Sequence, residues 1–331
     1  MMDGSHRGAR IAANYLDLGV NRTFIGVNMM KSKVDNKNVY CVDQNADMRA
    51  SLSEHPVVGA PVKSPMRDRN DLCADTTPVG KSDTTWFRSV LMSCSHFACW
   101  TRLDIACTVN RLAQLMVAPT VSAMNELKRL LKYLNGRPDF TLMATRPAEH
   151  STNVWDFCVD SDLAGGAPRD TRSRTGAIPI LNGMPISWRS NKQPKTSYSS
   201  AASEIYAFSE AVKDARLLLW RASELGVKVT HPFLLKEDNA ATVSFQKTTT
   251  LYSKLRGVYN LRDAWVRELK DVNVVEAVKV HTDLNIADLF TKCHEWHKMR
   301  RLLSLIDLDK EPNLEFRGCL DNLPVPLVAH E

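Results

Sequence analysis

The chain has 331 residues and a formal net charge of +6, and 44% of its residues are hydrophobic and 24% charged. These values are ordinary for a soluble globular protein, and the longest apolar runs, such as Leu217–Trp220, are too short to cross a bilayer. The N-terminal stretch has no apolar core of a secretory signal. We therefore expect a cytoplasmic or nuclear protein that does not contact a membrane, and the eight scattered cysteines fit a reducing compartment.

The first part of the chain reads as a long connection followed by helices. The connection is the segment 57–81, which is rich in proline, glycine and charge. From Thr85 to Leu134 the pattern is helical, and Met124, Leu127, Leu130, Leu131 and Leu134 have the spacing of an amphipathic helix. Asn135-Gly136 ends that helix by turn chemistry, which places a domain boundary near residue 145.

The next 150 residues predict a mixed sheet flanked by helices. Strands are expected at 154–160, 175–181 and 184–190, and Asn182-Gly183 is a strong hairpin-turn signal between the last two. A long helix follows, with Ser199 or Ser200 as its cap and Gly226 at its end. Then come a strand at 231–238, a short helix capped by Asn239, a helix at 261–273, a strand at 274–282 and a last helix capped by Asp283. An antiparallel run followed by alternating helices and strands favours a mixed α/β sheet.

Four isolated acids fall at the ends of these predicted elements. Asp160 closes the first strand, Glu204 lies in the first turn of the long helix, Asp238 ends the fourth strand, and Asp288 lies near the start of the last helix. Strand ends and helix starts can converge on one edge of such a sheet. Carboxylates gathered there repel one another unless a cation is present, and hard oxygen ligands suit Mg²⁺. Four of them can hold two ions about 3.5–4 Å apart for phosphoryl displacement.

Other interpretations of these residues are possible one at a time. A strand-end aspartate is more often a turn former or helix cap, and Asp238 before Asn239 fits that description. Within the stretch around Asp160, we expect Asp162 to support the loop and Asp156 to face solvent. Two cysteine–histidine groups, Cys94-x-His96-x₂-Cys99 and Cys293-His294-x₂-His297, lack the spacing of a structural zinc site, and no G-x-S-x-G motif marks a serine hydrolase.

One segment that begins before the second predicted strand and ends after the third is strongly basic. Between residues 169 and 195 there are six basic residues and one acid, Asp170. This is either a solvated hairpin surface or a set of phosphate contacts. The basic residues are Arg169, Arg172, Arg174, Arg189, Lys192 and Lys195.

Six short motifs follow one another in this part of the chain: CVDSDLAG, RSRTG, PISWRSNKQP, SSAASEIY, EDNAAT and NIADLFTK. Together they resemble the ribonuclease H domain that ends the polyproteins of copia-type LTR retrotransposons. They occur in the order of that family over roughly residues 154–300. The family's Y-x-D-A-D-W-A-G and R-S-T-S-G are represented by CVDSDLAG and RSRTG, and A-I-S-W-x-S-K-K-Q-P by PISWRSNKQP. S-S-T-E-A-E-Y, C-D-N-x-x-A and N-x-A-D-I-L-T-K are represented by SSAASEIY, EDNAAT and NIADLFTK.

Three upstream stretches, 14–29, 100–120 and 128–142, resemble the part of the same polyproteins that follows the polymerase active site. The Y-V-D-D polymerase motif has no counterpart here, so polymerase activity is not expected. The resemblance implies that residues 1–145 are a reverse-transcriptase remnant. This remnant would be part of the thumb or connection region and mostly helical. The resemblance further implies a ribonuclease H-like domain with a five-stranded mixed sheet at 146–305, and a tail at 306–331.

By position, the resemblance implies that Asp160, Glu204, Asp238 and Asp288 bind metal. The implied reaction is two-metal hydrolysis of the RNA strand of an RNA–DNA hybrid with Mg²⁺ or Mn²⁺. Asp160 would bridge both ions, Glu204 and Asp238 would hold the ion at the leaving group, and Asp288 would serve the nucleophile side. The basic segment would contact phosphates, and the hybrid would be read by its shape. Partners would be the reverse transcriptase and integrase of the polyprotein, in a virus-like particle or the nucleus.

Two departures from the family pattern keep alternatives open. Ala202 replaces a glutamate that we do not assign to metal, and RGVYN at 256–260 replaces K-H-I-D. A catalytically silent domain that binds nucleic acid or connects other domains is therefore the second hypothesis. A transposase-like or integrase-like nuclease is a third, weaker hypothesis. Such nucleases usually have three acids at a different spacing and a DNA-binding appendage, and neither feature is seen in this sequence. Whether the chain forms oligomers is not indicated.

Overall fold

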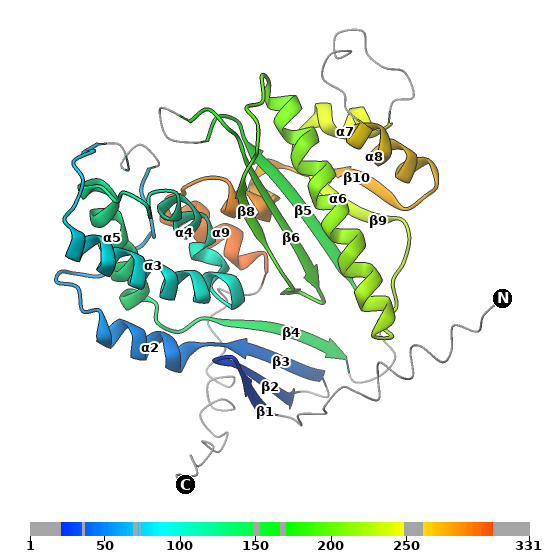
Figure 1. Cartoon of the computed structure of the whole chain (residues 1–331). Coiled ribbons are helices and arrows are strands. Elements are labelled where there is room, and N and C mark those ends of the chain that lie inside the picture. Colours follow the sequence, from blue (N-terminus) through cyan, green and yellow to red (C-terminus); the bar gives the residue numbers. More distant parts are fainter. Residues whose placement is uncertain are drawn as a thin grey trace.

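The computed structural model describes residues 21–34, 37–68, 72, 74–147, 153–165, 170–247 and 261–306. Within these ranges the protein is a mixed α/β structure, as predicted, and contains two separate β-sheets (Figure 1). No helix among the described residues combines the length and apolar character needed to span a membrane.

The smaller sheet is antiparallel and lies at the lower edge of the molecule in Figure 1. Its strands, in spatial order, are β1 (Asn21–Phe24), β2 (Val27–Val34), β3 (Lys37–Asp43) and β4 (Thr141–Pro147). The prediction of a mostly helical upstream segment overlooked this sheet. Two reasons are physical: β3 pairs with β4 across about a hundred residues of chain, and the β1–β2 turn uses Ile25 and Gly26 at positive φ in place of a recognisable turn dipeptide.

The described part of the upstream segment also contains the helices α2 (Asn45–Glu54), α3 (Lys81–Trp100), α4 (Ala106–Ala113) and α5 (Val121–Gly136). The predicted helical pattern is confirmed, although a 3₁₀ turn, η2 (Leu103–Ile105), and a loop divide it. Thr120 caps α5 by accepting a hydrogen bond from the backbone N–H of Ala123, and α5 ends at Gly136 as predicted. Its apolar stripe is buried.

The larger sheet has β5 (Trp155–Asp162) near its middle. Beside it lie β6 (Arg174–Leu181), antiparallel, and β9 (Phe233–Glu237), parallel, with β10 (Val275–Lys279) outside β9 and parallel to it. The predicted Asn182-Gly183 turn after β6 is confirmed, because both residues have positive φ, 51° and 86°. The sheet is therefore mixed, as the order of the predicted elements indicated.

The larger sheet has six strands, whereas five were predicted. The expected strand at 184–190 is split into β7 (Met184–Pro185) and β8 (Arg189–Lys192), and both pieces pair with β6. Between the two paired stretches the chain has three residues, 186–188, opposite only two on β6, which is the geometry of a β-bulge. The bulge aims the indole of Trp188 at the carbonyl of Ala98 on α3, to which it donates a hydrogen bond of 2.6 Å.

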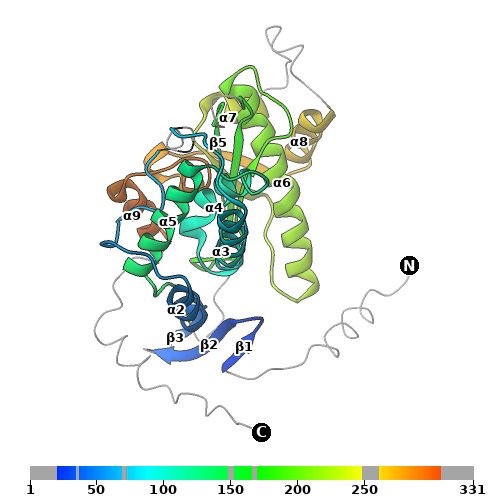
Figure 2. The same cartoon turned by 60° about the vertical axis from the view of Figure 1, so that its left-hand side comes forward.

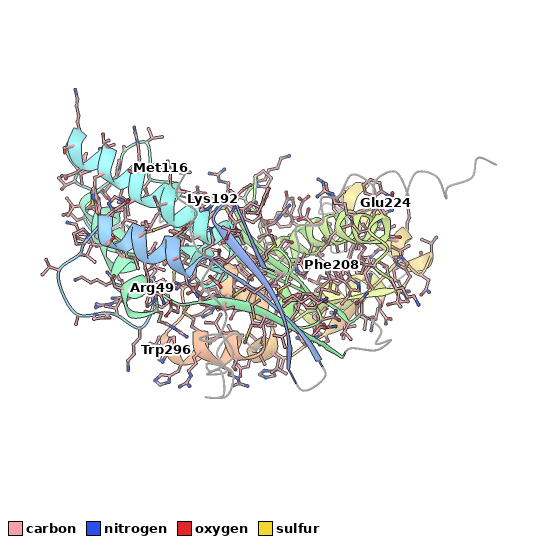
Figure 3. All side chains as sticks on the ribbon, turned by 90° about the horizontal axis from the view of Figure 1, so that it is seen from below. Arg49, Met116, Lys192, Phe208, Glu224 and Trp296 are labelled. Carbon is pink, nitrogen blue, oxygen red and sulfur yellow. The ribbon has the colours of Figure 1, made fainter. Side chains whose placement is uncertain are left out.

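Helices cover one face of this sheet, as Figures 1 and 2 show. They are α6 (Ser200–Glu224), α7 (Ala240–Lys247) and α8 (Leu261–Asp271). Phe157 and Val159 of β5 point to this side and pack with Phe208 of α6, which Figure 3 labels. Alternation along the strand sends Cys158 to the opposite side, where it joins a second apolar cluster.

That second cluster includes residues from both halves of the chain. It joins Leu91 and Leu127 of the upstream helices to Ile178 of β6 and Phe290 near the C-terminal end of the described chain. The last part, predicted as one helix capped by Asp283, is instead two 3₁₀ turns, η4 (Thr282–Leu284) and η5 (Ile286–Phe290), followed by α9 (Trp296–Ser304). Asn285 caps η5, so the expectation for Asp283 was wrong. Asn285 can reach this position because its amide also donates to the carbonyl of Val159, a tertiary contact.

Candidate metal centre

Three of the four predicted acids meet at one edge of the larger sheet. Asp160 lies near the end of β5, Glu204 in the first turns of α6, and Asp238 directly after β9. The parallel pairing of β5 and β9 brings their C-terminal ends together at this edge. One carboxylate oxygen from each of the three residues lies within 4.8 Å of those of the other two. The prediction that distant acids converge here is thus met for Asp160, Glu204 and Asp238, which we call the acid trio.

Helix starts help to hold this concentration of negative charge. Ser199 caps α6 by accepting a 3.1 Å hydrogen bond from the N–H of Ala202, as predicted. Asn239, also predicted as a cap, accepts hydrogen bonds from Ala241 and Thr242 at the start of α7. Both helices therefore begin beside the acid trio, and their positive dipole ends favour carboxylates there.

Two members of the acid trio, Asp160 and Glu204, are buried, whereas Asp238 is partly exposed. Burial, together with the neighbouring Asp288 and Asp238, raises the pKa of Asp160 to about 7 against the opposing effect of Lys292. Burial, together with the nearby carboxylate of Glu237, raises the pKa of Glu204 to about 11. Oxygen Oε2 of Glu204 is buried and has no hydrogen-bond partner. Such a group needs either a proton or a cation.

Glu237 is a fourth acid at this edge that the sequence interpretation did not assign. It is the last residue of β9 and is fully buried; its Oε1 accepts a 2.9 Å hydrogen bond from the N–H of Asn239, and its Oε2 has no partner. Burial raises its pKa well above the ordinary value. The signal in the sequence is its position next to Asp238 in EDNAAT, where the family pattern has cysteine.

Asp288 is close to the acid trio but lies in a different environment. It sits on η5, fully buried, and is surrounded by basic side chains. Lys292 Nζ lies 2.6 Å from its Oδ1, and Lys298 Nζ lies 2.5 Å and His294 Nε2 3.5 Å from its Oδ2. Burial would raise its pKa, but these neighbours outweigh burial and lower it. Lys292 also lies 3.4 Å from Asp160 Oδ2 and so connects the two carboxylates.

The position of η5 depends on a glycine and on an arginine from the upstream segment. A Cβ atom at Gly176 of β6 would lie 2.6 Å from the carbonyl oxygen of Ala287, so only glycine lets η5 lie this close to the sheet. Arg111 of α4 donates a 2.9 Å hydrogen bond to the carbonyl of Thr291, directly after η5. Thr291 in turn donates its hydroxyl to Asp160 Oδ2.

Arg111 holds the other loop of the site as well. It donates to the carbonyl of Gly165 and lies 3.5 Å from Asp162, so Asp162 supports this loop as expected. Asp156 is partly exposed and pairs with Lys236 of β9 at 2.6 Å. Neither belongs to the acid trio.

The basic segment is largely paired within the protein. Lys192 and Arg172 both contact Asp170, at 2.5 and 2.8 Å, and Arg189 contacts Glu210 and Asp214 of α6. Arg174 is buried, and its guanidinium donates to Asn110 and Ser190. Lys195 is exposed, and Arg169 lies outside the described residues, as does the 256–260 segment.

The cysteine–histidine groups do not form metal sites within the described residues, where the acid trio is the one group with suitable spacing. Cys94 is buried in α3, and His96 hydrogen bonds to Gln44 at 2.9 Å. His294 is turned toward the carbonyl of Asp288 at 2.9 Å.

Comparison with curated proteins finds Pol polyproteins of transposons. The chain is 30% identical over 210 residues to a retrovirus-related Pol polyprotein from transposon RE2 of Arabidopsis thaliana, which covers 63% of the chain and 14% of that protein. It is 22% identical over 296 residues to the Pol polyprotein from transposon TNT 1-94 of Nicotiana tabacum, 88% of the chain and 22% of the relative. The transposon Ty1-LR2 Gag-Pol polyprotein of Saccharomyces cerevisiae is 27% identical over 193 residues, 58% of the chain and 11% of the relative.

The matched regions thus span less than a quarter of the length of each of these relatives. No family model matches the chain, and no solved structure matches it.

Proposed function

We propose that this chain, which belongs to the Pol polyproteins of copia-type transposons, carries a Mg²⁺-dependent ribonuclease that hydrolyses the RNA strand of RNA–DNA hybrids. The observation that carries the proposal is the acid trio: three carboxylates from β5, α6 and the end of β9, with oxygens within 4.8 Å of one another. Its members match the acids of three separate motifs of the ribonuclease H resemblance. The mixed sheet with helices on one face also agrees with the fold that this resemblance implies.

The residues present suit a hard divalent cation. All donors in the acid trio are carboxylate oxygens, the type that Mg²⁺ prefers. The unpartnered Oε2 of Glu204 offers a buried ligand that the protein itself does not satisfy. Two raised pKa values, those of Asp160 and Glu204, indicate that the site is under-compensated without a cation. When bound, Mg²⁺ would supply Lewis acidity at a phosphoryl oxygen and at an attacking water.

The protein's own contribution to this reaction is placement. Asp160 is fixed on the central strand β5 and held by the hydroxyl of Thr291. Glu204 is held on a capped helix, and Asp238 leaves β9 at a turn whose next residue, Asn239, caps α7. Three rigid elements thus present ligands to one point, which keeps the reorganisation required in the transition state small. The exposed Lys195 and the partly exposed Arg172 would contact phosphates without reading bases, beside Lys192, which is paired with Asp170.

We further propose the division 1–145, 146–305 and 306–331 for the reverse-transcriptase remnant, the ribonuclease H-like domain and the tail. The change from the small sheet to the large one between β4 and β5 supports the first boundary. The remaining parts of a Pol polyprotein are the proposed partners.

The test is a cleavage assay with a labelled RNA strand annealed to DNA. The full chain should cut the RNA in the hybrid when Mg²⁺ is present and should leave single-stranded RNA and the EDTA-treated sample intact. Asp238→Asn should lower the rate at least about 100-fold, because loss of a direct ligand should exceed the usual effect of losing an outer contact. Asp156→Asn is the matched control: it removes an aspartate at the same sheet that pairs with Lys236, and should keep most of the activity.

A silent, nucleic-acid-binding domain is the second candidate. The observation that favours it is the cationic surrounding of Asp288, which leaves the fourth acid of the family pattern already ion-paired. Binding of the hybrid with no Mg²⁺-dependent cleavage in the wild-type chain would support this candidate and contradict the ribonuclease.

A further inference from the structure

Lys292 lies where a second cation would be expected. Its ammonium is 2.6 Å from Asp288 Oδ1 and 3.4 Å from Asp160 Oδ2, so it stands between the two carboxylates that a pair of metal ions would have to share. The ions of a two-metal site lie about 3.5–4 Å apart. The distances from the ammonium of Lys292 to its two carboxylates, 2.6 and 3.4 Å, are similar in scale.

Lys292 is held in this place by contacts on both sides. The backbone N–H of Lys292 donates a 3.3 Å hydrogen bond to the carbonyl of Asp288, which lies four residues earlier in the chain. The carbonyl of Thr291, the preceding residue, receives the hydrogen bond of Arg111. Since Asp160 Oδ2 also accepts the hydroxyl of Thr291, this oxygen already has two donors from consecutive residues.

Asp288 is charge-compensated without any metal. Its side chain is 1% exposed, yet Lys292 and Lys298 both lie within 2.6 Å of its oxygens. The acid trio, in contrast, excludes Asp288 and contains Glu204, whose buried Oε2 has neither a hydrogen bond nor an ion pair among the described residues. On the side of Asp160 that faces Glu204, the buried negative charge therefore lacks a cation. On the side that faces Asp288, the ammonium of Lys292 already provides one.

We propose that the ammonium of Lys292 takes the place of the second divalent cation, so that this site binds a single metal ion, at Asp160, Glu204 and Asp238. The inference rests on the metal centre of the proposed function and narrows it. Asp288 is then a positioning residue that fixes Lys292 beside Asp160. The fixed ammonium provides the positive charge on this side of the site, and the reaction needs one bound ion per chain.

The test uses Mn²⁺ to count the bound ions, because Mn²⁺ is paramagnetic and, like Mg²⁺, prefers oxygen ligands. The full wild-type chain is titrated with Mn²⁺, the bound ions are counted by equilibrium dialysis, and their spectrum is recorded by electron paramagnetic resonance. We expect one tight ion per chain with the hyperfine-split spectrum of an isolated ion. Lys292→Met, which keeps the apolar stem and removes the charge, should bind a second ion about tenfold or more tightly than the wild type does and show the spectrum of a spin-coupled pair.

Two variants serve as controls. Lys298→Met removes another cation from the same Asp288 but not from Asp160, and should keep one isolated ion. Lys292→Arg keeps the charge and should behave like the wild type. Circular dichroism and thermal unfolding establish that each variant is folded; if Lys292→Met does not fold, Lys292→Gln replaces it.

Three results would overturn the inference. A coupled pair of Mn²⁺ ions in the wild type would do so whether or not the variants fold, and so would a single isolated ion in folded Lys292→Met and Lys292→Gln. The third result is wild-type Mn²⁺ binding that is absent or is unchanged by Asp238→Asn. This third result would also remove the metal centre on which the ribonuclease proposal rests, whereas the first two leave that proposal standing.

Discussion

Single residues at the candidate metal centre combine deep burial with opposing charges. Asp160 and Glu204 are buried near other acids, and their pKa values are raised to about 7 and about 11. Asp288 is equally buried, but Lys292 and the other basic neighbours lower its pKa. A buried carboxylate is thus destabilised as an anion on one side of the site and stabilised on the other, where Lys292, Lys298 and His294 surround Asp288.

The raised pKa values predict how stability depends on pH without a divalent ion. Folded Glu204 and Asp160 keep protons that the unfolded chain releases at the ordinary values of 4.5 and 3.8. Their contribution to stability is therefore complete below about pH 4 and is lost as pH rises toward the folded values. In EDTA, thermal unfolding should occur at lower temperature at about pH 8 than at about pH 5.

Glu204→Gln provides the check, because glutamine stays neutral at every pH. The variant should show a clearly weaker decline over the same range, and Mg²⁺ should stabilise the wild type more at high pH than at low pH. A decline that is identical in the wild type and Glu204→Gln would contradict the assignment of this effect to Glu204.

At the scale of elements, the site depends on how closely η5 approaches β6. The 3₁₀ turn brings Asp288 and then Thr291 and Lys292 against the end of β5. The approach is possible because Gly176 has no side chain at the point where the carbonyl of Ala287 passes. A strand residue with a Cβ atom would push η5 outward and separate Lys292 from Asp160.

Gly176→Ala should therefore destabilise the protein by about 1–3 kcal/mol through overpacking. Urea unfolding measures this free energy. Gly80→Ala is a suitable comparison, since no atom lies within 4 Å of a Cβ built there, and its cost should stay within about 1 kcal/mol, the range for a helix N-cap. Equal effects of the two substitutions would show that the close approach of η5 does not limit stability.

At the scale of the whole molecule, the upstream segment and the larger sheet share one apolar core. That core contains residues of α3 and α5 together with Ile178 and Phe290. Arg111 of α4 reaches across this boundary and donates to the carbonyls of Gly165 and Thr291, the two loops beside the acid trio. The upstream segment thus forms part of the support of the candidate metal centre.

Arg111→Met should lower the free energy of unfolding by about 3 kcal/mol, because it removes the buried ion pair with Asp162 and the donor of two buried carbonyls. Arg49→Met is the matched control: the ion pair of Arg49 with Asp139 is 57% exposed on both sides, and its loss should cost less than about 1 kcal/mol. Urea unfolding of both variants decides between a structural and a negligible role, and similar values would contradict the supporting role of Arg111.

Predictions from short sequence patterns were confirmed where the structure depends on interactions between residues close together in the chain. The Asn182-Gly183 turn and the caps Ser199 and Asn239 are confirmed, since each depends on the conformations or hydrogen bonds of residues two or three positions away. The prediction failed for Asp283, where a tertiary hydrogen bond from Asn285 to Val159 decides the start of η5. It also missed the small sheet, whose β3–β4 pairing joins distant segments.

By itself, the sequence determined the mixed α/β class, the order of most elements and the convergence of Asp160, Glu204 and Asp238, because strand ends and helix starts carry local patterns and the motifs mark their acids. Only the tertiary structure decided which charges face each other. In the folded protein Arg174 and Glu237 are buried, and Lys192 pairs with Asp170. Lys292 lies between Asp160 and Asp288. The physical reason is that the pairing of charges depends on distances of a few ångströms between elements far apart in the chain, which no local pattern records.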